Sequence, residues 1–165
     1  MKNRTIKLWS VLGLAIAMAT VSVSAETLRA SATRIANDAG TTSGILKALD
    51  DAGHTSLAFK TSASNSLVKI TYNAECAVLG SGPEQWVTVS VFVDGVQANP
   101  KDGDDFALCT TLPNGVDFQW VGAVRQSLIK VPSIGTHNVQ IVVDLNNGAT
   151  EWWLGNTSLV VESQP

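Results

Sequence analysis

The stretch WVTVSVFVDG at residues 86–95 limits the possible folds of this chain more strongly than any other. Valine occupies every second position from residue 87 to residue 93. Side chains of a β-strand point alternately to opposite faces, so the four valines form one continuous apolar face. Asp94 and Gly95 then supply the two residues that tolerate positive φ in a tight hairpin turn. The stretch therefore predicts a half-buried strand that ends in a β-hairpin.

The rest of the chain repeats this pattern in short runs. In SLVKITYNAECAVL, residues 66–79, the set that includes Ile70, Tyr72 and Cys76 shares the apolar parity and is predicted to face the core. Further runs follow about every ten residues, separated by turn-forming Gly, Pro and Asn. Parallel strands need helical crossovers, and the sequence offers no helix longer than a turn or two. The pattern predicts an all-β fold, an antiparallel two-sheet β-sandwich that is jelly-roll-like, with about eight or nine strands.

Residues 26–55 have the least regular pattern. TLRASATRI alternates weakly and is compatible with an edge strand. SGILKALDDAG fits either a short strand or one helical turn, because its apolar spacing matches both periods.

The first 25 residues read as a signal peptide. Lys2, Arg4 and Lys7 precede an apolar run that ends in the small residues VSA at Ala25. The alternative is a transmembrane anchor, but the apolar run is short for a span and polar residues crowd its end. We therefore expect a secreted or periplasmic protein with one β-sandwich domain at residues 26–165 and no membrane anchor after cleavage.

Charge argues against two classes of partner. Without the leader, 8 Lys and Arg face 14 Asp and Glu, a net charge of −6, and no basic cluster is present. Such a domain has no electrostatic reason to bind nucleic acid or an anionic membrane surface.

Cys76 and Cys109 are the two cysteines of the chain. In an exported protein an even number of cysteines favours a disulfide bond. A metal pair or a catalytic thiol is the alternative, but the sequence has no CxxC motif and no histidine at ligand spacing from either cysteine.

No catalytic motif stands out. His54 and His137 lie in or beside turns, and we expect them to be solvated or to cap those turns. A pair of carboxylates could serve a hydrolase, but the sequence does not give the distance between two carboxylates across a sandwich. We expect that the protein is not an enzyme, with an uncharacterised hydrolase as the alternative.

The segment KDGDD carries three aspartates, Asp102, Asp104 and Asp105. Asp and Gly are ordinary residues of a solvated loop, which is one interpretation. Ca²⁺ prefers carboxylate and carbonyl oxygens from flexible loops, so the other is a structural calcium site without EF-hand spacing. Apart from this calcium, we expect no cofactor.

Tryptophans are the remaining indication of a ligand site. Trp86, Trp120 and Trp152 are candidate platforms for stacking against a sugar ring, although aromatic residues on strands also serve simple packing. Parity counted back from Leu159 predicts that Trp153 faces the core and Trp152 faces outwards. A β-bulge at Gly155 would reverse this assignment.

The order of these motifs resembles that of other small proteins. Roughly residues 56–162 resemble small exported bacterial β-sandwich proteins of unassigned function. The resemblance lies in ITYNAECAV, the VDG hairpin, FALC, the GTH strand and WWLGNTSLVVE. That resemblance implies the fold and the disulfide but no activity. The closing strand is also similar to the last strand of jelly-roll carbohydrate-binding modules, except that Gly155 and Asn156 stand where those modules carry two acids. NAECAV is similar to pilin subunits, although the N-terminal segment lacks the strongly apolar alternation of a donor strand.

The sequence thus predicts a non-catalytic module that binds a carbohydrate or another cell-surface ligand. The alternative is a structural or assembly subunit, pilin-like or part of a matrix. The oligomeric state is left open.

Overall fold

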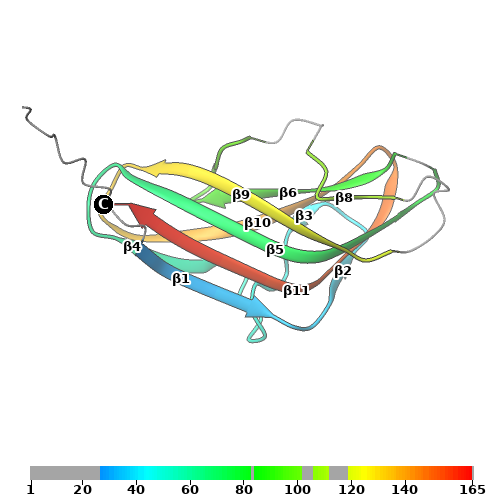
Figure 1. Ribbon diagram of the computed structural model, residues 1–165, viewed down its shortest axis with the longest axis horizontal. Coiled ribbons are helices and arrows are strands. Elements are labelled where there is room, and N and C mark those ends of the chain that lie inside the picture. Colours follow the sequence, from blue (N-terminus) through cyan, green and yellow to red (C-terminus); the bar gives the residue numbers. More distant parts are fainter. Residues whose placement is uncertain (1–26, 83, 102–105, 112–118, 165) are drawn as a thin grey trace, which may run out of the picture.

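Two antiparallel β-sheets pack against each other in the protein (Figure 1). The computed structural model describes residues 27–82, 84–101, 106–111 and 119–164. The signal peptide predicted for residues 1–25 lies outside this part of the chain. Every regular element in the described part is a β-strand, so the predicted all-β two-sheet sandwich is confirmed.

The front sheet, which faces the viewer in Figure 1, has the strand order β1–β11–β5–β9, with β2 beside β11. Its strands are β1 (Thr27–Arg34), β2 (Asp38–Gly40), β5 (Ser66–Gly80), β9 (Val121–Val131) and β11 (Ala149–Gln164).

The back sheet has the order β3–β10–β6–β7, with β4 beside β10 and β8 beside β6. Its strands are β3 (Gly44–Ile45), β4 (Leu57–Thr61), β6 (Trp86–Val93), β7 (Val96–Gln97), β8 (Cys109–Thr110) and β10 (Gly135–Asn146). More strands are present than the predicted eight or nine, because a strand as short as β2 leaves no periodic pattern.

The chain passes from one sheet to the other between each long strand and the next. In chain order β1, β4, β5, β6, β9, β10 and β11 alternate between the front and the back sheet. This alternation is the connectivity of a jelly roll. Among the described residues, no helix is long and apolar enough to cross a membrane.

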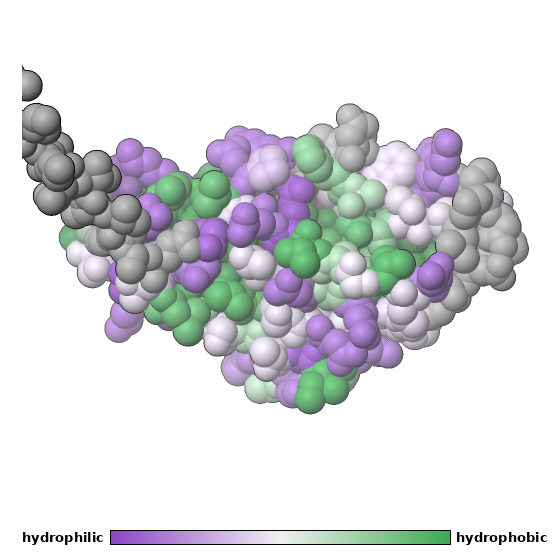
Figure 2. All heavy atoms as spheres, in the orientation of Figure 1, coloured by the Kyte–Doolittle hydropathy of each residue, from purple (hydrophilic) through white to green (hydrophobic). Residues whose placement is uncertain are grey.

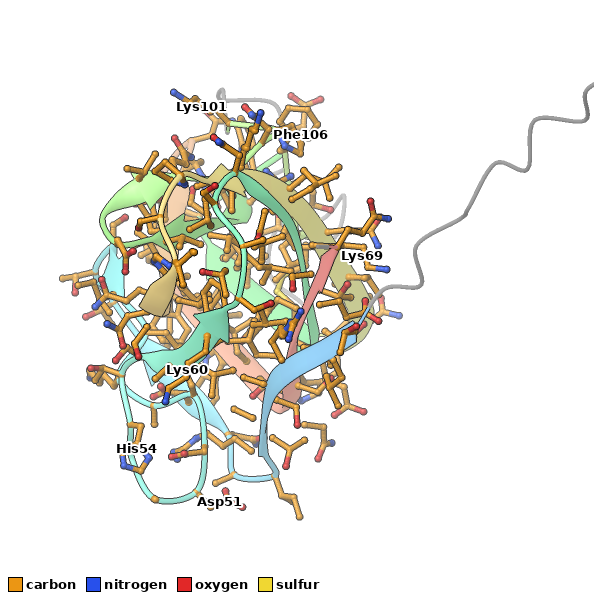
Figure 3. The ribbon with its side chains drawn as sticks, turned by 90° about the vertical axis from the view of Figure 1, so that its left-hand side faces the viewer. Asp51, His54, Lys60, Lys69, Lys101 and Phe106 are labelled. Carbon is orange, nitrogen blue, oxygen red and sulfur yellow. A yellow bond between two sulfur atoms is a disulfide. The ribbon has the colours of Figure 1, made fainter. Side chains whose placement is uncertain are left out.

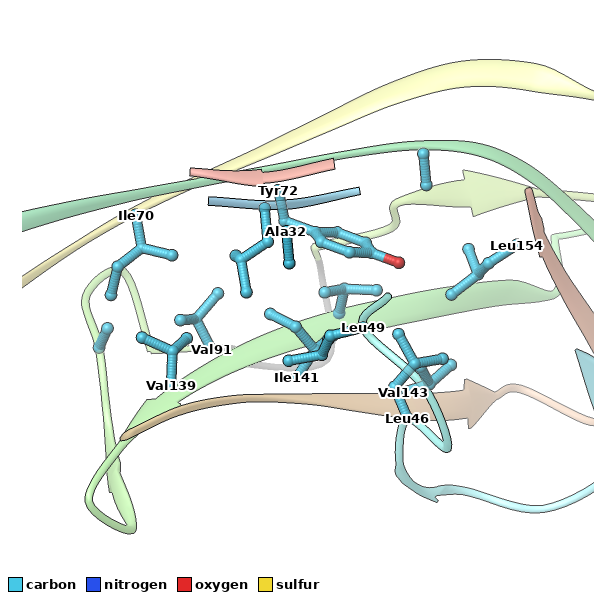
Figure 4. Packing of buried hydrophobic residues seen from close by; sticks show 14 of the residues in the cluster. Ala32, Leu46, Leu49, Ile70, Tyr72, Val91, Val139, Ile141, Val143 and Leu154 are labelled. Carbon is cyan, nitrogen blue, oxygen red and sulfur yellow. The ribbon is translucent and has the colours of Figure 1, made fainter. Parts of the chain in front are cut away.

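The core lies between the inward faces that the alternation predicts. The valines of β6 at positions 87–93 are 0–3% exposed, and Val139, Ile141 and Val143 of β10 lie beside them at 0%. From the front sheet, Ile70 and Tyr72 of β5 point into the same layer (Figure 4). Burying one such aliphatic side chain stabilises the fold by about 1.5–3 kcal/mol. Burial also raises the pKa of the Tyr72 hydroxyl, and the nearby Asp38 carboxylate adds to this shift.

Residues 44–56 close one side of the sandwich without forming a helix. Leu46 and Leu49 come from the connection between β3 and β4 and are 1% and 2% exposed (Figure 4). The two side chains fill the core from an irregular segment, so the helical turn that was one interpretation of this stretch is not formed. Figure 3 shows Asp51 and His54 on this connection, at the bottom of the view. Lys101 and Phe106 lie at the opposite side of the sandwich, at the top.

Strand β11 contains a β-bulge that reverses the predicted orientation of its tryptophans. Gly155 pairs with Glu75 and Ser158 pairs with Asn73, so Asn156 and Thr157 together oppose a single residue of β5. Asn156 has a φ of 45°, a left-handed conformation that Asn tolerates better than most residues.

The bulge resets the parity of the strand. Leu159 and Val161 face the core on one side of it, and Trp152 and Leu154 face the core on the other. The expectation that Trp152 faces outwards was therefore wrong, and the bulge alternative is confirmed.

The Asp94-Gly95 hairpin and the disulfide are both as predicted. The two turn residues have φ values of 49° and 80° and join β6 to β7. Cys76 of β5 and Cys109 of β8 form a disulfide, which links the front sheet to the back sheet. Disulfides are typical of proteins from oxidising compartments outside the cytoplasm.

Replacing Cys109 with Ser is expected to destabilise the protein. The disulfide closes a loop of 33 residues in sequence separation, which corresponds to about 3–4 kcal/mol in the chain-entropy account of cross-links. Urea denaturation of Cys109→Ser and of the reduced wild type should give the same lowered free energy of unfolding. Equal stability of the oxidised wild type and the variant would contradict the assignment.

Candidate functional site

The three tryptophans predicted as ligand platforms lie in three different places. Trp152 is in the core, 3% exposed, and its indole N–H donates to the Thr42 carbonyl at 3.1 Å. A Cβ at Gly40 would come within 2.6 Å of its ring, so the backbone packs directly on it. This burial leaves no ring face of Trp152 open for stacking.

Trp86 begins β6 on the outer side of the back sheet, between Thr110 of β8 and Asn146 of β10. It is half-buried, and its indole nitrogen has no hydrogen-bond partner within the described part of the chain. Trp120 lies instead at the front sheet, one residue before β9.

Trp120 and Trp153 stand on either side of Ala77 on the outer side of the front sheet. Trp153 pairs with Ala77, and Trp120 directly precedes Val121, which pairs with Cys76. Two strand spacings separate the two tryptophan positions, or about 10 Å. Both rings are partly exposed, while Ala77 between them is only 1% exposed.

Gly155 lets Trp120 approach the sheet closely. A Cβ at Gly155 would lie 3.5 Å from the far end of the Trp120 ring and would collide with the side-chain oxygen of Asn37. The Trp120 ring therefore reaches across β5 towards β11, where Trp153 is two residues from Gly155 on the same outward side.

Polar side chains adjoin the two rings. Glu75 is exposed beside Ala77, and its Oε2 accepts a hydrogen bond from Asn156 Nδ2 at 2.7 Å. Asn73, the next outward residue of β5, donates to Ser158 Oγ at 3.0 Å. We call the surface formed by Trp120, Trp153, Ala77, Glu75 and Asn156 the tryptophan face.

A shallow depression continues the tryptophan face at the edge of the sheet. It has a volume of about 350 Å³ and shares Ala39, the partner of Trp153 in β2. Thr41, Glu151 and Lys47 are among its lining residues. Hydroxyl, carboxylate and ammonium groups thus line a depression that borders Trp153 through Ala39.

Figure 2 shows the side of the molecule that the front sheet forms. Hydrophobic and hydrophilic side chains are interspersed over it, without a single large apolar patch. A surface of this kind suits a ligand that carries both apolar and polar groups.

The sequence pointed to Trp120 but missed the partners that surround it. Trp153, Glu75 and Asn156 come together only because the bulge turns Trp153 outwards. The Gly155-Asn156 pair inside a long strand was the available signal, since these two residue types mark bulges and left-handed positions.

The proposed calcium ligands Asp102, Asp104 and Asp105 lie outside the described residues. Within the described part of the chain, no group of three or more His, Cys, Asp or Glu side chains could hold a metal ion.

His54 lies in a turn, as predicted. It is exposed, and its Nδ1 lies 2.7 Å from Asp50 Oδ2. Hydrogen bonds from the His54 side chain and backbone hold the pKa of Asp50 below its usual value.

His137 departs from the prediction because it is buried, 4% exposed. Its Nδ1 donates to Asp94 Oδ2 at 2.6 Å, and its Nε2 lies 3.1 Å from Thr61 Oγ1 and 3.2 Å from the Ser133 carbonyl oxygen. The ring stacks obliquely near Phe59, with 5.5 Å between centroids. His137 thereby ties the tip of the β6–β7 hairpin to the connection between β9 and β10.

The order Asp94, His137, Thr61 resembles that of an acid, base and nucleophile. A nucleophilic hydroxyl must give its proton to the base. The Thr61 hydroxyl instead donates to the Ser133 carbonyl at 2.9 Å, and the side chain is 4% exposed. The arrangement is that of a structural link between loops.

No protein-family model and no curated protein matches the sequence.

Replacing Asp94 with Asn is expected to remove one acid-sensitive contribution to stability. Burial opposes ionisation of Asp94, but hydrogen bonds from His137 and the Asn138 N–H outweigh it, so the pKa of Asp94 is lowered. A carboxylate with a lowered pKa stabilises the fold above its unfolded pKa of about 3.9, and this contribution is lost as the pH falls through the folded value.

Melting curves between pH 2 and 7 test this expectation. The wild type should exceed Asp94→Asn in melting temperature at pH 6, and the difference should vanish near pH 2. Asn tolerates the positive φ at this position, and Asp51→Asn in the exposed turn serves as the control. A difference independent of pH would refute the role of the charge.

Proposed function

We propose that the protein is a non-catalytic, secreted or periplasmic module that binds a carbohydrate at the tryptophan face. The observation that carries the proposal is the placement of Trp120 and Trp153 on either side of Ala77, with Glu75 and Asn156 beside them. A cell-surface glycan is the ligand class that this surface fits best.

Sugars combine the two properties that the tryptophan face offers. The C–H face of a pyranose ring is apolar and flat, so it packs against an aromatic ring, whose negative face attracts polarised hydrogens. The hydroxyl groups at the rim of the sugar need hydrogen-bonding partners in fixed positions. Glu75 and Asn156 lie beside Gly155, which the Trp120 ring contacts, and Asn73 is the next outward residue of β5, so these side chains provide such partners.

Two further observations support an exported binding module. The Cys76–Cys109 disulfide favours an oxidising compartment, in agreement with the signal peptide predicted at residues 1–25. The acidic balance of the chain and the carboxylate on the face argue against nucleic acid as the ligand.

Substitution of either ring tests the proposal. In native affinity gels that contain soluble polysaccharides, Trp153→Ala and Trp120→Ala should each weaken retention at least about tenfold, equivalent to about 1.4 kcal/mol. Trp86→Ala, on the outer side of the back sheet, is the matched control and should bind like the wild type.

Melting curves must show that the variants are folded, and Trp153→Phe, which keeps a ring, should recover part of the retention. If the wild type binds no polysaccharide in a broad panel, the proposal is wrong. Equal losses for Trp86→Ala would also contradict it.

A structural or assembly subunit is the second candidate, and the free side of β9 favours it. Val124 and Leu128 of this edge strand are 66% and 44% exposed. Among the described residues, the backbone pairing on that side is the bridge between Leu128 and Asn99. An open edge can accept a strand from another chain.

Size-exclusion chromatography with light scattering separates the two candidates. We expect a monomer that is unaffected by a peptide of residues 26–40, because residues 27–34 already pair with β11 in their own sheet. Oligomers, or a shift on addition of the peptide, would favour the assembly subunit instead.

A further inference from the structure

We infer that the tryptophan face selects uncharged and amino-sugar glycans and rejects polyanionic ones such as polyuronates and sulfated glycans. This inference rests on the proposed function and adds the chemical class of the ligand.

The charge at the tryptophan face is negative. Glu75 is exposed beside Ala77, and the one hydrogen bond that its carboxylate accepts within the described part of the chain comes from the neutral Asn156 amide. The other oxygen of the Glu75 carboxylate accepts no hydrogen bond within the described part of the chain. That oxygen can accept a hydrogen bond from a sugar hydroxyl or from the ammonium group of an amino sugar, but not from a carboxylate or sulfate.

The amide donors near the rings are partly used within the protein. Asn156 Nδ2 is directed to Glu75, and Asn73 Nδ2 is directed to Ser158. Their amide oxygens remain as acceptors. The polar part of the tryptophan face thus offers mainly hydrogen-bond acceptors, which suit a ligand with many hydrogen-bond donors.

Most of the basic side chains of the front sheet are engaged away from the tryptophan face. Lys69 forms an ion pair with Glu162 at 2.8 Å, and it lies six residues, or about 20 Å, along β5 from Glu75. Arg34 donates to the Asp50 carbonyl and Arg125 to the Pro100 carbonyl. At physiological salt, charges more than about 8 Å away are largely screened, so Lys69 does not offset Glu75.

Among the described residues, Lys47 is the basic side chain that lines the depression beside this surface. It lines the depression beyond Ala39 together with Glu151, so a carboxylate accompanies it there. An anionic sugar would meet Glu75 at the rings and Glu151 in the depression. Repulsion between like charges at about 6 Å in a half-solvated site is expected to weaken binding roughly tenfold.

A charge series of polysaccharides tests the inference. Native affinity gels would contain hydroxyethyl cellulose, mannan or xylan as neutral probes, glycol chitosan as the cationic probe, and alginate or polygalacturonate as anionic probes. We expect retention by at least one neutral or cationic probe and at least about tenfold weaker retention by the anionic probes. Added salt should weaken retention by glycol chitosan and leave the neutral probes unchanged.

Glu75→Gln should reduce retention by glycol chitosan and raise retention by alginate several-fold. Asp144→Asn, which removes the same charge from the outer side of the back sheet, should change neither. The two failures are distinct. Retention by alginate or polygalacturonate equal to or above that by the other probes overturns the inference and leaves the proposed function standing, whereas no retention by any probe overturns the proposed function itself.

Discussion

The two sheets can bury their inner faces only if each long strand keeps its apolar side chains on the same side along its whole length. Strand β11 runs for 16 residues through the middle of the front sheet and meets this requirement with the β-bulge at Asn156 and Thr157. Without the extra residue at Asn156, either Trp152 and Leu154 or Leu159 and Val161 would point to solvent. Each large apolar side chain turned out of the core would cost about 1.5–3 kcal/mol. The bulge is therefore a condition for closing the sandwich.

The same bulge builds the outer surface. When Trp152 turns into the core, Trp153 must turn outwards, where it meets Trp120 across Ala77. The left-handed conformation of Asn156 also directs its amide to Glu75. The β-bulge thus allows packing on the inner side of the sheet and creates a mixed aromatic and polar surface on the outer side.

The core faces of the central strands, the hairpin and the disulfide could be predicted from the residues alone, because each depends on local sequence or residue type. The alternation around Val87–Val93 and Ile70–Tyr72 specifies inward faces, because strand periodicity depends only on neighbouring residues. The Asp94-Gly95 turn and the disulfide also follow from residue type and compartment. By contrast, Leu46 and Leu49 fill the core from an irregular connection, and no period marks such residues.

The residue pattern was enough to specify the all-β class, the core faces of the central strands, the hairpin and the pairing of two cysteines. The register across the bulge, the burial of Trp152 and the burial of His137 depend on contacts that form only in the folded protein. The physical reason is that a bulge adds one residue against a partner strand, and His137 is enclosed by Asp94, Thr61 and Ser133 from three separate segments. Such contacts join residues far apart in the chain, and periodicity carries no information about them.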